Sequence, residues 1–127
     1  MTRTIAIIGA GPVGLAAAAH AVERGMKPLI LERGPAVAHA VTQWSHVPMF
    51  SPWAFNIDPA AERLLMTTGW NRPAPNAYPT GGDLLEQYLV PLSERPPLRA
   101  ALPLNAGVVA VSRLVFDKVK SPGRDQA

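Results

Sequence analysis

The sequence predicts an α/β fold, and three features near the N-terminus carry that prediction. The β-branched run Thr4–Ile8 is typical of a buried strand. A glycine-rich turn leads into the alanine-rich stretch Pro12–Arg24, which predicts a helix because proline fits a first helical turn and Gly25 is well placed to end it. A second apolar run, Pro28–Glu32, predicts another strand. Strand, helix and strand in this order predict a βαβ unit with parallel strands and a right-handed crossover.

The middle of the chain is less regular. Residues 33–56 mix aromatic side chains with prolines, which predicts a long aromatic loop, alone or with short helical turns. Asp58 and Pro59 then form a clear helix start, with the aspartate as the N-cap and the proline at the first helical position. We expect this helix to run to about Thr67, and the stretch Arg72–Pro79 to form a linker or surface loop.

Further elements are expected in the second half of the chain. Thr80 is another candidate N-cap, and Asp83 three residues later makes a short-armed version of the capping box. The helix that they begin is expected to end near Ser93. The β-branched stretch Gly107–Arg113 predicts a strand, and Leu114–Lys120 could be its hairpin partner.

Length and composition fit one modest domain. The chain has 127 residues, of which 48% are hydrophobic, so it can bury a core. We expect one incomplete domain over residues 1–127. Its expected parts are a βαβ core over 3–33, a loop and helical segment over 34–94, a strand region over 104–120 and a frayed tail over 121–127. Such a unit leaves an uncovered sheet surface, through which the chain could associate with itself.

Charge and residue counts exclude several kinds of partner and site. The net charge is +3, but the 12 Lys and Arg are scattered along the chain, so we expect no nucleic-acid partner. The absence of cysteine excludes disulfides and thiolate metal sites, and three dispersed histidines give no metal-ligand spacing. The uncharged N-terminal run is too short for a membrane span. Glycines and a proline interrupt its similarity to a signal peptide. A cytoplasmic setting is the default expectation for a chain without cysteine.

The N-terminal turn has the spacing Gly-x-Gly-x-x-Gly, and each glycine has a separate task. Gly9 allows a sharp turn off the strand, Gly11 allows a pyrophosphate to approach the backbone, and Gly14 allows the helix to pack close to the sheet. Pro12 and Val13 occupy the first helical turn, whose N–H groups and positive dipole end point at the phosphates. The motif therefore predicts a dinucleotide-binding site.

Glu32 ends the second predicted strand, close to the spacing expected for the acid that binds the ribose hydroxyls of a dinucleotide. Its carboxylate would accept hydrogen bonds from both hydroxyls and repel a 2′-phosphate, which favours FAD or NAD over NADP. Arg33 stands next to it and could receive a phosphate, so the exclusion of NADP is partial. The alternative is a glycine turn of purely structural use, with Glu32 merely exposed at a strand end.

On these residues the sequence resembles the flavoproteins with two dinucleotide-binding motifs, which couple NAD(P)H to FAD. Flavin-containing monooxygenases and thioredoxin-reductase-like enzymes belong to that group. Ile5–Gly14 with Leu29–Glu32 resembles the first glycine motif of the group, the one that holds FAD. Trp44–Trp53, Asn56–Pro59 and Tyr78–Leu84 resemble segments of a bacterial subgroup of FAD-dependent oxidoreductases.

The resemblance implies a Rossmann-like FAD/NAD(P)-binding domain, of which this chain is the N-terminal portion with an inserted aromatic loop and helices. The three glycines would face the pyrophosphate and Glu32 the ribose. Val108 or Val109 would lie in the strand whose backbone contacts the adenine, and Val108 is the preferred candidate. No second glycine motif follows, so we expect a fragment or truncated reading frame of a flavin-dependent NAD(P)H oxidoreductase of monooxygenase-like type, with little activity of its own. The alternative is a non-catalytic NAD- or ADP-ribose-binding module or remnant.

No residues of the sequence form a recognisable catalytic set. His46 lies between Trp44 and Trp53, which would place it near the flavin as a proton donor, but a loop histidine that satisfies backbone groups is the simpler interpretation. Trp44, Phe50 and Trp53 could line a flavin or substrate pocket, although packing of the loop onto the core is the expected use of such aromatics. His20 is expected on the helix surface.

Overall fold

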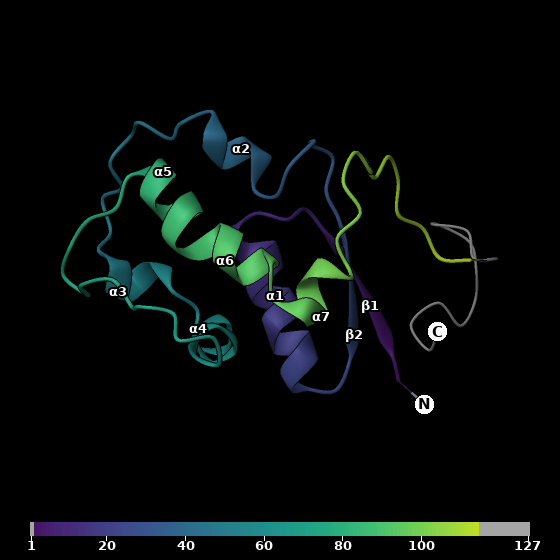
Figure 1. Ribbon diagram of the computed structural model, residues 1–127. Helices are drawn as coiled ribbons and strands as arrows, with labels where there is room; N and C mark the ends of the chain where they lie inside the picture. Colours follow the sequence, from purple (N-terminus) through teal and green to yellow (C-terminus); the bar gives the residue numbers. More distant parts are fainter. Residues whose placement is uncertain (1, 115–127) are drawn as a thin grey trace.

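The computed structural model describes residues 2–114, and Figure 1 shows how their elements are arranged. Strand β1 (Thr4–Ile8), helix α1 (Pro12–Glu23) and strand β2 (Lys27–Leu31) form the βαβ unit that the sequence predicts. The two strands pair in parallel, with Ile7 opposite Ile30. Both of these side chains are buried under α1, as is expected where a helix covers one face of a parallel sheet. The α/β class is thereby confirmed.

Helix α1 lies at the centre of the molecule, between the sheet and the helices of the second half of the chain (Figure 1). It is rich in alanine, so its neighbours can approach closely. Gly25 ends it with a φ of +69°, a left-handed conformation that favours glycine. The core packed around α1 comes mainly from leucines and aromatics of the later helices: Leu65, Leu84, Tyr88, Leu89, Leu92 and Leu98.

The stretch after β2 is a loop with short helical turns, one of the two forms expected for it. Its turns are α2 (His39–Thr42) and α3 (Trp53–Asn56). Helix α4 (Pro59–Met66) follows with the predicted cap, because the Asp58 carboxylate accepts a hydrogen bond from the Ala61 N–H at 3.0 Å.

The second predicted helix is present as a continuous run of three segments, α5 (Gly81–Leu84), the π-helical turn η1 (Leu85–Leu89) and α6 (Val90–Ser93). Its predicted capping box is confirmed. The Thr80 hydroxyl accepts a hydrogen bond from the Asp83 N–H at 3.1 Å, and the Asp83 carboxylate accepts one from the Thr80 N–H at 2.9 Å. A short helix α7 (Pro96–Arg99), which the sequence analysis does not anticipate, follows it.

The π-helical turn has a local cause. Pro91 has no N–H, so it cannot donate to the Gln87 carbonyl four residues before it. That carbonyl instead accepts a hydrogen bond from the Trp70 indole Nε1 at 2.7 Å. The indole therefore supplies the donor that the proline lacks, and the backbone widens by one residue at this place.

The strand expected over residues 107–113 is a wrong prediction, since no strand is formed there. The chain lies beside β2 earlier than predicted: the Ile30 N–H donates to the Ala101 carbonyl at 2.7 Å, and the Ala106 N–H donates to the Glu32 carbonyl at 2.8 Å. Pro103 between them has no N–H to return to β2, so a regular ladder cannot form. Most of the expected hairpin partner, and the tail over 121–127, lie outside the described residues.

One sheet face stays uncovered in the described residues. Ile8 is 61% exposed, and Leu29 on β2 is 38% exposed, whereas Ile7 and Ile30 on the opposite face are buried. The surface through which self-association is expected is therefore present. Self-association itself stays a prediction.

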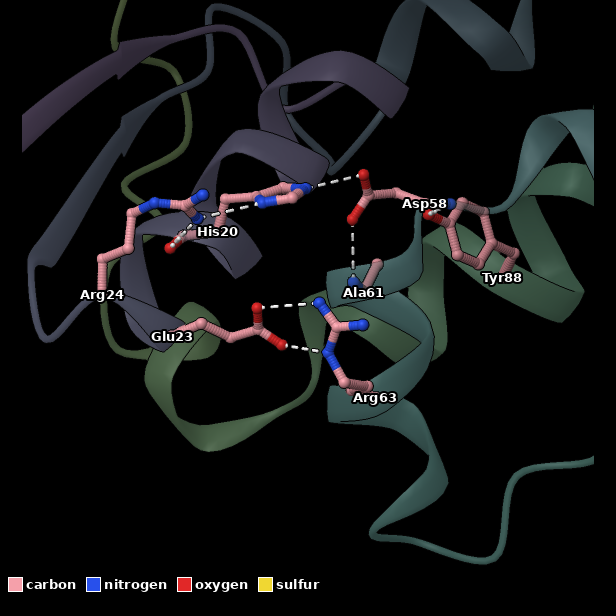
Figure 2. Close-up of polar contacts among 7 residues, drawn as sticks. All are labelled: His20, Glu23, Arg24, Asp58, Ala61, Arg63 and Tyr88. Carbon is pink, nitrogen blue, oxygen red and sulfur yellow. Dashed lines mark hydrogen bonds and ion pairs between the residues drawn. The ribbon is translucent and has the colours of Figure 1, made fainter.

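Two polar contacts fasten α4 to α1, and Figure 2 shows them side by side. The His20 Nε2 lies 2.8 Å from an Asp58 carboxylate oxygen, and Arg63 pairs with Glu23 through two hydrogen bonds. Burial acts to raise the pKa of Asp58, but the hydrogen bonds from Ala61 and His20 outweigh it, so the pKa lies below its ordinary value. His20 is thus a cross-link between helices rather than a plain surface residue.

Tyr88 joins this network from η1. Its hydroxyl accepts a hydrogen bond from the Asp58 N–H at 3.1 Å, and the two residues lie next to each other in Figure 2. Burial of the ring raises the pKa of the phenol above its ordinary value, although the bond from Asp58 acts in the opposite direction. Three elements from distant parts of the chain therefore meet at one aspartate.

Candidate dinucleotide site

The turn between β1 and α1 is as tight as its three glycines suggest. Gly9 has a φ of +95°, and its N–H donates to the Leu31 carbonyl at 2.9 Å, so the turn is tied to the end of β2. A Cβ added to Gly14 would stand 1.9 Å from the Gly9 carbonyl oxygen. No side chain fits in that space, and the first turn of α1 therefore packs directly on the turn.

The middle glycine faces open space. A Cβ added to Gly11 would have no atom within 4 Å, so steric packing inside the protein does not require glycine there. Gly11 is also the N-cap of α1, and no side chain caps this end of the helix. Pro12 follows at the first helical position, and Val13 beside it is 83% exposed. The open glycine and the uncapped helix end leave room and donors for an anionic group.

The Glu32 carboxylate is held from both sides by backbone N–H groups. One oxygen accepts a hydrogen bond from Ala10 in the glycine turn at 3.0 Å, and the other accepts one from Gly34 at 2.6 Å. A carboxylate has about four lone-pair sites, so each oxygen keeps a position for a further donor. Glu32 is therefore oriented at the glycine turn and can still accept hydrogen bonds from a ligand.

Two residues without a predicted role, Ala10 and Gly34, help to build this arrangement. Ala10 is fully buried, and its carbonyl accepts a hydrogen bond from the Ala38 N–H at 2.9 Å while its own N–H binds Glu32. A Cβ added to Gly34 would stand 2.5 Å from the Cβ of His39 and 3.1 Å from the Glu32 carboxylate. For Gly34, the only sequence signal is a glycine three residues after the apolar run of β2. Ala10 has no signal beyond its place inside the glycine motif.

A cavity of 340 Å³ lies over the glycine turn, within the range of small-ligand sites. Six of the eight predicted site residues line it. The complete lining is Ile8, Gly9, Gly11, Pro12, Leu31, Glu32, Arg33, Ala38, Ala40, Val41, Ala106 and Val108. Val13 instead lines a neighbouring cavity, and Gly14 is used in packing. Val108 reaches the cavity from an irregular segment and not from the strand that was expected.

The aromatic loop divides between core and surface. Trp53 is 4% exposed and belongs to the core, and Trp44 lies so close to Gly81 that a Cβ there would contact its ring at 2.5 Å. These two follow the packing interpretation. Phe50 is 98% exposed, so the packing interpretation is wrong for this residue. His46 is exposed and lines none of the cavities described here.

Other kinds of site find no support in residues 2–114. No group of three or more acidic, histidine or cysteine side chains is placed there to hold a metal ion. Within the same part of the chain, no helix has both the length and the apolar character needed to cross a membrane.

Comparison with protein families gives a match over residues 6–102 to the family described as pyridine nucleotide-disulphide oxidoreductase. The chain belongs to this family. The match begins within β1 and ends after α7, so it includes the glycine turn, the aromatic loop and the helices described above. It confirms the resemblance to nucleotide-dependent oxidoreductases that the sequence predicts. None of the curated proteins matches the chain.

Solved structures share the fold of this family member. A bacillithiol disulfide reductase from Bacillus cereus matches with a TM-score of 0.67 and 22% identity, over 91% of this chain and 32% of its own. An oxidized steroid monooxygenase bound to NADP matches with a TM-score of 0.61 and 19% identity, over 83% and 20%. OTEMO in an FAD-bound form matches with a TM-score of 0.58 and 18% identity, over 82% and 19%. The chain thus spans a fifth to a third of these proteins.

Proposed function

We propose that this chain binds the adenosine and pyrophosphate end of FAD and serves as the N-terminal cofactor-binding part of a flavin-dependent NAD(P)H oxidoreductase of monooxygenase-like type. The observation that carries the proposal is the Glu32 carboxylate, held by Ala10 and Gly34 beside the open glycine turn. An acid at this place and a backbone free of side chains at Gly11 are the two features that a dinucleotide needs.

The residues present fit the phosphate part of such a ligand. Gly11 leaves the space that a Cβ would fill, and the uncapped N-terminus of α1 directs backbone N–H groups and the positive end of the helix dipole toward it. Pro12 lacks an N–H, so the donors are those of the residues after it. These groups would bind and orient the pyrophosphate without any charged side chain.

The residues also fit the ribose and the adenine. Each Glu32 oxygen would accept one ribose hydroxyl in addition to its backbone donor. Leu31, Val41 and Val108 give the same cavity apolar walls against which a base could pack. A 2′-phosphate would meet the Glu32 carboxylate, which favours FAD or NAD over NADP in this cavity, while Arg33 in the lining lessens that preference.

FAD supplies the redox chemistry when bound, and the chain's own residues supply binding and orientation. The name of one matching structure, a steroid monooxygenase bound to NADP, supports a monooxygenase-like parent, and the FAD-bound form of a second, OTEMO, supports FAD as the cofactor. We expect the chain alone to show no NAD(P)H-dependent oxygen uptake above background.

The proposal is tested by titrating the chain with FAD, NAD, NADP and ADP-ribose in a calorimeter, with flavin fluorescence as a second readout. We expect FAD to bind most tightly and NADP most weakly. Binding of NAD or ADP-ribose without FAD would replace the proposal by that of a non-catalytic nucleotide-binding module. Absence of binding by all four ligands would contradict the assignment of the cavity.

A further inference from the structure

A second cavity, of 860 Å³, lies apart from the glycine turn and shares no lining residue with the first. Its walls come from the loop after β2, from the end of α6, from α7 and from the segment beside β2. Pro35, Val37, Leu102 and Leu104 give it an apolar side. None of the residues that the sequence marks as candidate site residues lines it, and the proposed FAD site does not extend into it.

The other side of this cavity is charged. Arg95 and Arg99 both line it, one as the N-cap of α7 and the other in its last turn, together with the single acidic residue Glu94. Two cations against one carboxylate leave a net positive charge. Thr68 and Ser93 also line the cavity, but their hydroxyls already donate to the carbonyls of Leu65 and Val90.

Neither arginine has an acidic partner in the described part of the chain, where three salt bridges join other residues. Arg95 donates from one Nη to the Thr67 hydroxyl at 3.2 Å, a long bond to a neutral acceptor. Its Nε is buried and has no hydrogen-bond partner, and among residues 2–114 it is the single buried side-chain polar atom in that state. An unsatisfied buried donor of a charged group is costly, and an anion would relieve it.

We infer that this cavity binds a small organic anion, a carboxylate or phosphate monoester carrying an apolar body. The guanidinium presents Nε and an Nη in one plane, which matches two oxygens of such a group. Binding turns the Arg95 side chain toward the cavity, so that the bond to Thr67 is exchanged for a bidentate pair. Arg99 adds the second positive charge, and the apolar body packs against Val37, Leu102 and Leu104.

The test is calorimetric titration of the chain with hexanoate and hexyl phosphate, with hexanol as the uncharged probe of the same apolar body. We expect both anions to bind, hexanol to bind at least about tenfold more weakly, and saturation with FAD to leave the affinities unchanged. The ¹H–¹⁵N resonance of the Arg95 Nε should shift on anion binding. Equal affinity for hexanol and hexanoate, or no anion binding at millimolar concentration, would overturn the inference.

Variants distinguish binding of the anion in this cavity from its general attraction to a positively charged chain. Arg95→Gln should weaken hexanoate binding about tenfold, and Arg95→Lys should recover only part of it, because lysine keeps the charge but not the planar fork. Glu94→Gln should strengthen binding two- to threefold, roughly the effect of removing one nearby exposed like charge. Arg113→Gln is the matched control, since this exposed arginine lines none of the described cavities. An equal loss in the Arg113 variant would contradict the site.

Discussion

The Glu32 carboxylate accepts a hydrogen bond from the backbone N–H of Ala10 at 3.0 Å, and so joins the end of β2 to the glycine turn that follows β1. The contact connects residues that are 22 positions apart. It means that the acid expected to bind ribose also fixes the shape of the turn expected to bind phosphate. The positions of the two halves of the proposed site are therefore coupled through this hydrogen bond.

Replacement of Glu32 should weaken the binding of FAD. Glu32→Gln keeps one acceptor oxygen but loses the charge, and Glu32→Ala loses both, so we expect losses of about 1–3 kcal/mol with alanine the larger. Calorimetric titration with FAD measures both values. Glu86→Gln on the exposed side of η1 serves as the control. An unchanged FAD affinity in the alanine variant would remove Glu32 from the site.

The middle and last glycines of the motif should differ in how much a side chain there costs in stability. Gly14→Ala places a Cβ against the Gly9 carbonyl, and overpacking of this kind costs about 1–3 kcal/mol of unfolding free energy. Gly11→Ala at the open position, with an ordinary φ of −85°, should leave stability unchanged or slightly raised. Urea unfolding of the two variants checks the contrast, and equal destabilisation would contradict the packing described for α1.

Gly11→Val should instead act on the ligand. The larger side chain fills the space in front of the turn, so we expect the chain to fold and FAD binding to fall below detection. Circular dichroism verifies the fold, and flavin fluorescence measures binding. Retention of FAD affinity by a folded Gly11→Val chain would show that the pyrophosphate does not approach here.

Asp58 should make stability depend on pH in the acid range. Its pKa in the folded protein lies below the ordinary value, so its contribution is complete above about pH 4 and is lost as the pH falls through the lowered folded pKa. Asp58→Asn should retain the helix cap and lose this acid dependence. Asp58→Ala should also lose the cap, at about 0.5–2 kcal/mol. Urea unfolding between about pH 2 and about pH 7 checks both expectations, because this interval includes the ordinary aspartate pKa of about 3.9.

The indole of Trp70 and the ring of Pro91 should be energetically coupled. Trp70→Phe leaves the Gln87 carbonyl without its indole donor, for which we expect a loss of about 1 kcal/mol. Pro91→Ala restores a backbone N–H at the position that lacks one, so the same tryptophan replacement should cost less in that background. A double-mutant cycle by urea unfolding measures the difference. Additive effects would separate the π-helical turn from the proline.

Elements marked by short-range signals are predictable from the sequence. The N-caps Asp58 and Thr80 appear where their residue types and the following Pro59 and Asp83 place them, because capping depends on neighbours within one turn. The βαβ unit is equally local, with strand bounds that differ from expectation by one residue at β2. The family match shows that these signals lead to the right class of protein.

What the sequence hides depends on contacts across the chain. The strand expected over 107–113 has β-branched residues, but a strand needs a partner, and β2 is already contacted by residues 101–106. His20 looks like a surface residue until Asp58, 38 positions later, folds next to it. Gly34 looks like a turn glycine until its distance from His39 is known. Each miss comes from long-range geometry that composition and spacing do not carry.

The wall of the glycine-turn cavity comes from two places in the chain, residues 8–41 and the pair Ala106 and Val108. During synthesis the first group leaves the ribosome long before the second. A nascent chain therefore carries the glycine turn and Glu32 while one wall of the cavity is still missing. On the proposed function, FAD would meet a complete cavity only after the last of these residues has left the ribosome.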